Sequence, residues 1–105
     1  MPRRQIEWSQ LALDQFDELL SYLRQRNPTA AHRVGRAIIN VVDQIGLFPE
    51  AHRAVAGLPP AYREAFVKNY RLLYRLIDDE RVRLISIRHT RQRPLTPDEI
   101  LELER

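Results

Sequence analysis

The sequence predicts an α+β fold in which a two-helix antiparallel hairpin packs on a four-stranded antiparallel sheet. Three features carry this prediction: one short alternating segment near the start, two long segments with helical apolar spacing between residues 10 and 47, and three strand-like runs after residue 61. The predicted order is β-α-α-β-β-β, with a short C-terminal helix or tail over residues 94–105. A chain of 105 residues is long enough to bury one core, so we expect residues 1–105 to form a single domain.

Residues 4–47 contain the first strand and both long helices. Residues 4–8 alternate polar and apolar side chains and end at Ser9, a residue type that favours the N-cap of a helix. Asn27 and Pro28 likewise provide a cap and a first-turn proline, so helices over 10–26 and 28–47 are joined by a very short connection. Such a connection predicts an antiparallel hairpin, in which Gly35 and Ala37 allow close approach of the two backbones.

The second half of the chain begins with a loop and continues with three strands. Residues 48–60 contain three prolines and one glycine without a sustained period, whereas residues 62–67, 70–77 and 82–89 have strand-like patterns. Thr96 and Glu99 form a capping-box pattern before a helix over 97–104. We expect the helix hairpin to return the chain to the end of the sheet that it left, so consecutive strands should run in opposite directions throughout.

The apolar stripes of both helices are expected to cover one face of this sheet. The predicted core consists of Phe16, Leu20, Val34, Ile38, Val41, Leu72 and Tyr74. Arg71 and Arg75 alternate with the apolar residues of their strand, so they should point to the opposite face, which is left for solvent or for a partner.

The composition excludes several classes of protein and site. The chain has no cysteine, so neither disulfides nor thiolate metal sites are available, and its three histidines lack metal-ligand spacing. We therefore expect no metal and no cofactor, and the sequence contains no phosphate-binding loop, dinucleotide fingerprint or nucleophile elbow. No apolar run is long enough to span a membrane, and Met1 to Gln5 lead into a strand rather than a signal peptide, so we expect a cytoplasmic protein without a membrane partner.

Positive charge is concentrated in the strand region. Nine basic residues stand against four acidic ones between Arg63 and Arg93, although the net charge of the whole chain is only +3. One interpretation is a surface that binds nucleic acid or an acidic protein segment through guanidinium groups. The other is a solvated strand face, and charge alone leaves both interpretations open.

A series of short motifs follows a fixed order along residues 6–93. The motifs are Ile6-Glu7-Trp8-Ser9, Asn27-Pro28, Tyr62-Arg63-Glu64, Asn69-Tyr70-Arg71 and His89-Thr90-Arg91. This ordered set resembles the RelE/ParE superfamily of type II toxin-antitoxin toxins, closest to its ParE branch. The resemblance implies two helices on an antiparallel sheet and a toxin that inhibits bacterial growth, contributes to plasmid stabilisation and is neutralised by a cognate antitoxin.

The superfamily contains two kinds of toxin, and the resemblance implies different site residues for each. A ParE-like poison of DNA gyrase has no catalytic residues, and its target- or antitoxin-binding residues here would be Arg63, Arg71, Arg75, Arg83, His89, Arg91 and Arg93. A RelE-like, ribosome-dependent mRNA endonuclease cleaves RNA without metal, with His89, Arg91, Arg63 and Arg71 as the matching residues. Ala65 replaces a second basic residue of the nucleases, and no tyrosine follows Tyr74, so gyrase poisoning is the preferred interpretation.

The resemblance also implies the partners. They are a ParD-like antitoxin with an acidic amphipathic C-terminal segment and DNA gyrase, or alternatively the ribosome and mRNA, with operator DNA contacted only through the antitoxin. A second alternative is a non-toxic binding module that acts only in an antitoxin-repressor complex. For any of these, we expect His89, Arg91 and Arg93 to be exposed and close to Arg63 or Arg71.

Overall fold

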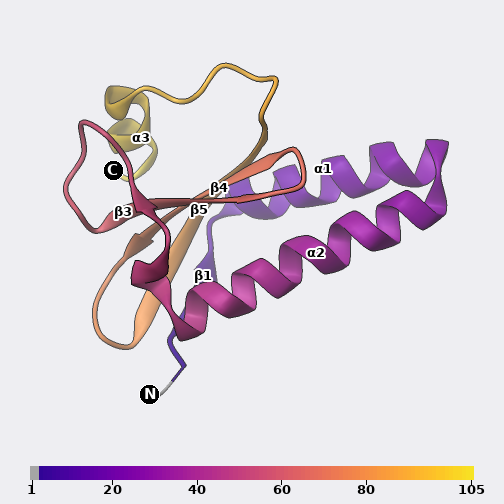
Figure 1. Cartoon of the computed structure of the whole chain (residues 1–105). Helices are drawn as coiled ribbons and strands as arrows, with labels where there is room; N and C mark the ends of the chain where they lie inside the picture. Colours follow the sequence, from indigo (N-terminus) through magenta and orange to yellow (C-terminus); the bar gives the residue numbers. More distant parts are fainter. Residues whose placement is uncertain (1–2) are drawn as a thin grey trace.

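The computed structural model describes residues 3–105 and has the α+β architecture that the sequence predicts (Figure 1). Met1 and Pro2, which the single-domain prediction includes, lie outside the described residues. The elements in chain order are β1 Gln5–Trp8, α1 Gln10–Arg26, α2 Pro28–Leu47, a 3-10 turn Pro49–Ala51, β2 Arg53–Ala54, β3 Tyr62–Val67, β4 Tyr70–Leu76, β5 Arg81–His89 and α3 Pro97–Leu103.

The helix hairpin is formed as predicted, with both long helices beginning and ending where the sequence indicates. The Ser9 hydroxyl accepts a hydrogen bond from the Ala12 backbone N–H (2.9 Å), and the Asn27 side chain accepts one from Ala30 (3.1 Å). At Gly35 an added Cβ would lie 3.2 Å from the Leu20 Cδ2 atom. The expected close approach of α1 and α2 therefore occurs at Gly35, where a larger residue would push Leu20 aside.

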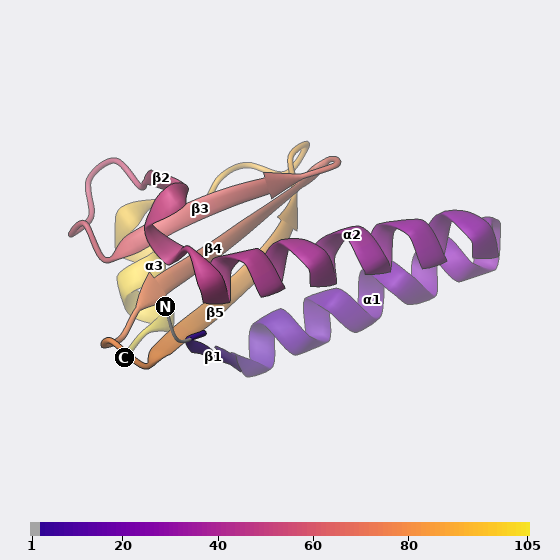
Figure 2. The same ribbon diagram turned by 60° about the horizontal axis from the view of Figure 1, so that its bottom comes forward.

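The sheet differs from the prediction because it is mixed and has five strands, in the order β1-β5-β4-β3-β2. The last three strands form the expected antiparallel meander, but β1 pairs with β5 in parallel. The reason is that α2 carries the chain back past the end of β1 to its beginning, where the Arg4 N–H donates to the Gly46 carbonyl (2.8 Å). Figure 2 shows α2 ending beside the start of β1. The strand β3 therefore starts from the same end of the sheet as β1.

The segment 48–60, predicted as a loop, contains a 3-10 turn and the two-residue strand β2. Arg53 and Ala54 pair with Glu64 and Arg63 of β3, which makes β2 the outer strand at that edge. A two-residue strand has no detectable sequence period, so the pairing partner alone determines it.

A β-bulge interrupts the pairing of β4 with β5. Leu73 pairs with Ser86 and Tyr74 pairs with Leu84, which leaves Ile85 as the extra residue. Because of this insertion, both Leu84 and Ile87 pack in the core beneath the helices, although they are three residues apart. Every residue of β5 after the bulge therefore points to the face opposite to the one that simple alternation predicts.

The sheet has an apolar cluster on each face. The helix-side core contains Ile38, Leu72 and Tyr74, all fully buried, and Phe16, Val34 and Val41 pack against it as predicted. Leu20 is only half-buried and contacts the Gly35 region between the helices instead. On the other face, α3 covers a second cluster of Tyr62, Leu73, Ile85 and Ile100. The face predicted to be open is therefore partly closed by the C-terminal helix.

Replacement of Ser9 by alanine tests how the hairpin is joined to the sheet. Ser9 is buried, and its hydroxyl caps α1 while donating to the Ile85 carbonyl (2.6 Å). Loss of the cap and of the partner for a buried carbonyl should lower the free energy of unfolding by about 2–3 kcal/mol in urea denaturation. Ser21→Ala, at an exposed position inside α1, is the matched control and should change it by less than about 0.5 kcal/mol. Equal effects of the two substitutions would contradict this account.

Candidate functional site

The sheet face opposite the two long helices carries a cluster of arginines. Arg71 and Arg75 lie there as the sequence predicts, and so does Arg83, because each occupies a position that alternates with the helix-side core. Arg53 and Arg88 join them and were not predicted as site residues. Arg53 fell in an apparent loop, and Arg88 reaches this face only because of the bulge at Ile85. We call these five residues the arginine face.

The C-terminal helix holds one end of the arginine face in place. Glu104 accepts from Arg75 Nε (2.8 Å) through one carboxylate oxygen and from Arg83 Nε (3.1 Å) through the other. The Glu104 side chain is 7% exposed, so this double ion pair is shielded from solvent more than a surface pair is. Arg75 and Arg83 are thereby bound to the C-terminal segment. The other three arginines of the face do not contact Glu104.

The remaining arginines surround a cavity of about 250 Å³ beside α3. Its lining residues are Arg53, Val55, Ala56, Glu64, Arg71, Leu73, Ser86, Arg88, Pro94, Leu95 and Ile100. Arg71 Nη1 and Arg88 Nε are buried here without a hydrogen-bond partner among residues 3–105. An unpaired buried donor costs about 1–3 kcal/mol. Two such donors on neighbouring guanidinium groups are suited to an oxyanion, either a carboxylate or a phosphate.

An exposed aromatic ring adjoins this cavity. Phe66 is 43% exposed, and the guanidinium groups of Arg53 and Arg71 lie 4.9 and 5.1 Å from its centroid. Glu64 orients both arginines, accepting from Arg53 Nε at 2.7 Å and contacting Arg71 Nε at 3.5 Å. Aromatic and arginine side chains are the residues that dominate protein interfaces, so Phe66 extends the arginine face as a contact surface.

Arg63 lies on the helix side of the sheet, where it has a structural role. Its guanidinium donates to the carbonyls of Pro60 (2.9 Å) and His52 (2.9 Å), which fixes the loop before β3. Its register partner Tyr74 is buried and donates to the Pro49 carbonyl. Burial raises the pKa of Tyr74 to about 12, and the charge of Arg63 opposes this only in part. Arg63 is therefore directed at the protein's own backbone.

His89 and Arg91 also lie away from the arginine face. His89 pairs with Tyr70 on the helix side of the sheet, whereas its neighbour Arg88 pairs with Arg71. The half-buried His89 ring accepts a hydrogen bond at Nδ1 from the Arg91 N–H (3.0 Å) and lies 5.2 Å from the Tyr70 ring. The predicted grouping of His89 with Arg71 or Arg63 is thus not formed. The bulge turns His89 away from the face of Arg71, and Arg63 lies further along the sheet on the same face as His89.

Arg93 is exposed as predicted but is held by an ion pair. Its guanidinium donates to both carboxylate oxygens of Glu99, at 2.7 and 3.0 Å, in the first turn of α3. The Arg93 carbonyl in turn accepts from Arg88 Nη2 (2.9 Å). Arg93 therefore connects α3 to the arginine face rather than extending it.

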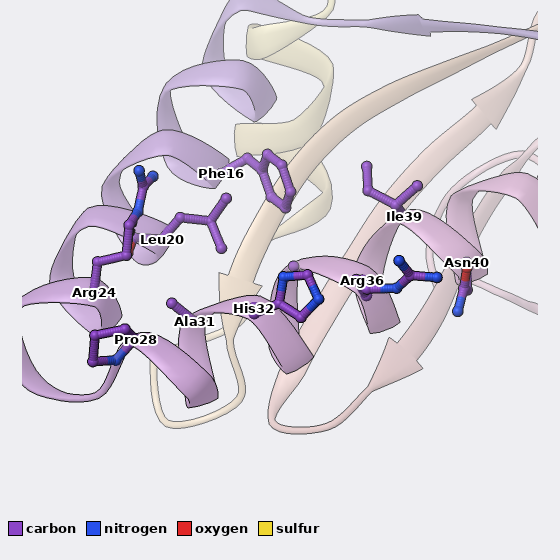
Figure 3. Close-up of a pocket in the computed structure, with 10 residues that line it drawn as sticks. Phe16, Leu20, Arg24, Pro28, Ala31, His32, Arg36, Ile39 and Asn40 are labelled. Atoms are coloured by element: carbon purple, nitrogen blue, oxygen red, sulfur yellow. Dashed lines mark hydrogen bonds between the residues drawn. The ribbon is translucent and has the colours of Figure 1, made fainter.

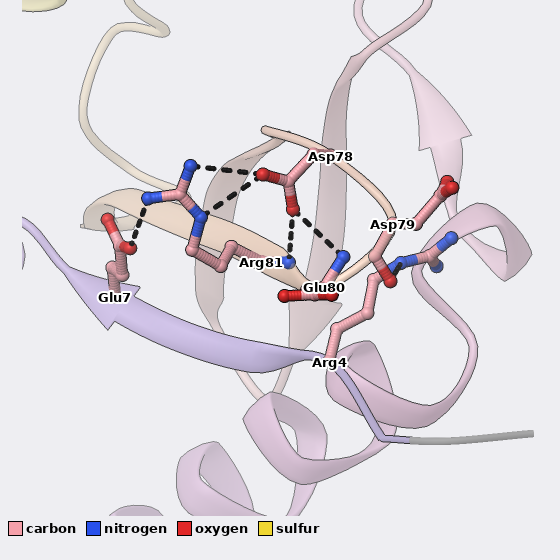
Figure 4. Close-up of polar contacts among 6 residues, drawn as sticks. All are labelled: Arg4, Glu7, Asp78, Asp79, Glu80 and Arg81. Atoms are coloured by element: carbon pink, nitrogen blue, oxygen red, sulfur yellow. Dashed lines mark hydrogen bonds and ion pairs between the residues drawn. The ribbon is translucent and has the colours of Figure 1, made fainter.

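A polar cluster at the β1 edge of the sheet contains Arg81, which has a structural role there (Figure 4). Arg81 contacts Asp78 (3.0 Å) and Glu7 (3.3 Å), which joins the β4–β5 turn to β1. The backbone N–H of Glu80 and then the Arg81 side chain lower the pKa of Asp78 below its usual value. This cluster stabilises a turn, and Arg81 is not part of the arginine face.

The outer surface of the helix hairpin has a groove with a cavity volume of about 710 Å³. Figure 3 shows Phe16 and Leu20 of α1 and Ala31 and Ile39 of α2 lining it. Basic residues Arg24, His32 and Arg36 stand around this apolar floor. We call it the hairpin groove.

Within residues 3–105, no three histidine, aspartate or glutamate side chains gather closely enough to hold a metal ion. The helices of the same region include none that is both long and apolar enough to cross a bilayer.

Solved structures share this fold. The chromosomal ParDE system from P. aeruginosa contains a chain that superposes with a TM-score of 0.67 at 12% identity, covering 83% of this chain and 96% of that one. A chain of the RelBE2 toxin-antitoxin complex from Mycobacterium tuberculosis superposes with a TM-score of 0.60 at 17% identity. The match covers 84% of this chain and 99% of that one. A chain of the YoeB dimer from Staphylococcus aureus superposes with a TM-score of 0.58 at 17% identity. This match covers 84% of this chain and 98% of that one. The fold is therefore shared with chains from structures of two toxin-antitoxin systems.

Sequence relationships define the family more narrowly. The ParE toxin family of type II toxin-antitoxin systems (parDE) matches residues 6–94. The Sinorhizobium fredii protein "Putative toxin Y4kP" is 31% identical over 94 residues, covering 88% of this chain and 94% of its own length. The chain belongs to the ParE toxin family and is a toxin of a type II toxin-antitoxin system.

The ion pair between Arg93 and Glu99 gives a testable pH dependence. The guanidinium of Arg93, followed by hydrogen bonding with Thr96, lowers the pKa of Glu99 from 4.5 to about 2. Because the folded-state pKa is depressed, the pair stabilises the fold above pH 4.5 and loses its contribution as the pH falls to about 2. An NMR titration should show the Glu99 pKa rising toward 4.5 in Arg93→Gln and staying low in the control Arg91→Gln. A wild-type midpoint near 4.5 would contradict the pairing.

Proposed function

We propose that this chain is a ParE-like toxin that inhibits bacterial growth by poisoning DNA gyrase, which implies a cytoplasmic site of action. The observation that carries the proposal is the cavity on the arginine face, where Arg71 and Arg88 have buried donors without a partner among residues 3–105, beside exposed Phe66. This arrangement is suited to gripping acidic groups of a macromolecule. Membership in the ParE toxin family supports the same target.

The positions of the nuclease-like residues weigh against RNA cleavage. Metal-independent cleavage needs an acid, a base and cations around one phosphate. Arg71 lies on the opposite face of the sheet from His89. Arg63 is on the same face as His89 but pairs with Tyr74, whereas His89 pairs with Tyr70, four residues away along β4. At ~3.3 Å per residue this separates them by about 13 Å, too far to act on one phosphate.

The proposal predicts a direct effect on gyrase. The purified chain should inhibit DNA supercoiling and accumulate cleaved DNA, while leaving mRNA intact in a ribosome-dependent cleavage assay. Arg71→Gln and Arg88→Gln should each weaken gyrase inhibition by about tenfold or more, because they remove charged donors from the cavity. Arg33→Gln, at an exposed position on α2, should have no effect.

Two results would overturn this proposal. Cleavage of mRNA without an effect on gyrase would favour the RelE-like alternative. Normal growth of cells that produce the folded chain without an antitoxin would favour the non-toxic binding module.

We further propose that a cognate, ParD-like antitoxin neutralises the chain with an acidic amphipathic segment lying in the hairpin groove. The ParDE structure is that of a TA system and the RelBE2 structure is a toxin-antitoxin complex, which supports such a partner. The groove offers an apolar floor that includes Ile39, which is 40% exposed, and a rim with Arg24 and Arg36. Operator DNA would then be contacted only through the antitoxin.

Apolar contacts and ion pairs should contribute differently to this complex. Folding of a disordered segment on binding costs about 2–5 kcal/mol, whereas an exposed ion pair contributes roughly 0–1 kcal/mol. The apolar floor must therefore supply most of the affinity, and the arginines of the rim mainly accelerate association.

Binding kinetics of the toxin and its cognate antitoxin test the assignment of the groove. Ile39→Ala should speed dissociation by about tenfold, because it removes buried apolar area from the interface. Leu13→Ala, at a similarly exposed position (43%) outside the groove, is the control and should leave the rate unchanged. Raising salt from about 50 to about 500 mM should slow association far more than it speeds release. Equal effects of Ile39→Ala and Leu13→Ala would exclude this groove.

A further inference from the structure

A second polar cleft lies between α1 and the turn end of the sheet, on the helix side. Its volume is about 860 Å³, within the range of small-molecule sites. Its lining residues are Gln15, Glu18, Leu19, Tyr22, Leu23, Val34, Lys68, Asn69, Tyr70, Ile87, His89, Arg91 and Gln92. The helix hairpin extends beyond the sheet here, as Figures 1 and 2 both show. We call it the tyrosine cleft.

One exposed and one half-buried tyrosine line the cleft. Tyr22 of α1 is 57% exposed, and the Arg26 guanidinium lies 3.7 Å from its ring centroid. Burial and the neighbouring Tyr22 both raise the pKa of Tyr70, and the His89 ring lies edge-on to Tyr70. A guanidinium stacked over one face of Tyr22 leaves the other face for a second flat group.

Polar groups of three kinds surround these rings. Lys68 and Arg91 bring positive charge, against the single carboxylate of Glu18. Asn69 and Gln92 bring amides, which can both donate and accept hydrogen bonds. His89 accepts at Nδ1 from the Arg91 N–H, so its neutral ring carries the proton on Nε2 and offers a further donor.

We propose that the tyrosine cleft binds an unpaired nucleotide, with the base stacked on Tyr22 and the phosphate at Lys68 and Arg91. Single-stranded nucleic acid is bound by this combination of aromatic platforms and basic side chains. Side-chain amides match the mixed donors and acceptors on the edges of a base. An acidic peptide would need the basic residues but neither the rings nor the amides, so the chemistry favours a nucleotide.

The nucleotide is bound here without being cleaved. The raised pKa of Tyr70 makes its hydroxyl a weak proton donor, and the Nδ1 atom of His89 is occupied by the Arg91 N–H. The cleft is also separate from the arginine face, which lies across the sheet. Oligonucleotide binding and gyrase inhibition can therefore be disrupted independently.

Fluorescence anisotropy with the full-length chain and labelled 12-nucleotide probes tests the proposal. The probes are a single-stranded DNA, an RNA of the same sequence and the corresponding DNA duplex. We expect both single strands to bind more tightly than the duplex and the RNA to remain intact. Preference for either sugar supports the proposal and identifies DNA or RNA as the source of the nucleotide.

Two substitutions separate stacking from phosphate binding. Tyr22→Ala should weaken single-strand binding by roughly tenfold, the effect of losing one stacked base, whereas Tyr22→Phe should preserve it. Arg91→Gln should reduce the slope of log affinity against log salt by about 0.7, the value for one phosphate contact on a single strand. Phe48→Ala and Arg33→Gln are the controls: Phe48 is 63% exposed and Arg33 is exposed, and neither lines the cleft.

Several results would overturn the proposal. Equal affinity for the duplex, or complete displacement of the probe by an oligoglutamate of equal charge, would indicate a general polyanion surface. Unchanged binding by Tyr22→Ala would exclude stacking, and cleavage of the RNA would show a reaction that the proposal does not include. Gyrase inhibition by Tyr22→Ala, measured in parallel, keeps failure of this proposal distinct from failure of the proposed function.

Discussion

The structure depends on how the buried Ser9 joins the helix hairpin to the sheet. Its backbone N–H donates to the Leu84 carbonyl, and its hydroxyl accepts from Ala12 and donates to the Ile85 carbonyl. One residue thus ends the pairing of β1 with β5, starts α1 and satisfies the backbone at the bulge. A little further along α1, Gln15 accepts from the Ile87 N–H (2.7 Å), so the helix replaces the strand partner that β5 lacks beyond β1. Buried backbone groups need such partners, and this need fixes the direction of α1 over the sheet.

The bulge at Ile85 then decides which functional groups share a surface. It turns Arg88 toward Arg71 and places His89 beside Tyr70 on the helix side. On one face this produces a cavity whose guanidinium donors have no partner within the described part of the chain, and on the other face a cleft with tyrosines and His89. The adjacent residues Arg88 and His89 therefore belong to different surfaces. Arg88 lies on the arginine face, which is suited to acidic groups, and His89 lies in the tyrosine cleft, which is suited to flat, anionic ligands.

The C-terminal helix limits the arginine face. Through Glu104 it holds Arg75 and Arg83, and through Glu99 it holds Arg93. Ile100 completes the apolar cluster beneath it. Four of the six arginines in this region, Arg53, Arg75, Arg83 and Arg93, form ion pairs of 3.1 Å or less with internal carboxylates, which leaves them less available to a partner. Positive charge counted along the sequence thus overstates the charge available on the surface.

Local patterns in the sequence determined both long helices, their caps at Ser9 and Asn27, the antiparallel meander and the capping box of α3, because each depends on residues close together in the chain. The ordered motifs likewise indicated the toxin family, which the matches over residues 6–94 confirm. Tertiary structure alone decided the parallel pairing of β1 with β5, the strand β2 and the bulge. These features depend on the end of the sheet at which α2 stops and on which residues, distant in the sequence, form hydrogen bonds with the backbone of the strands. For the same reason the sequence placed Arg71 correctly on the arginine face but missed Arg53 and Arg88. It also grouped His89 with Arg71, which lies across the sheet, and with Arg63, which lies further along the same face.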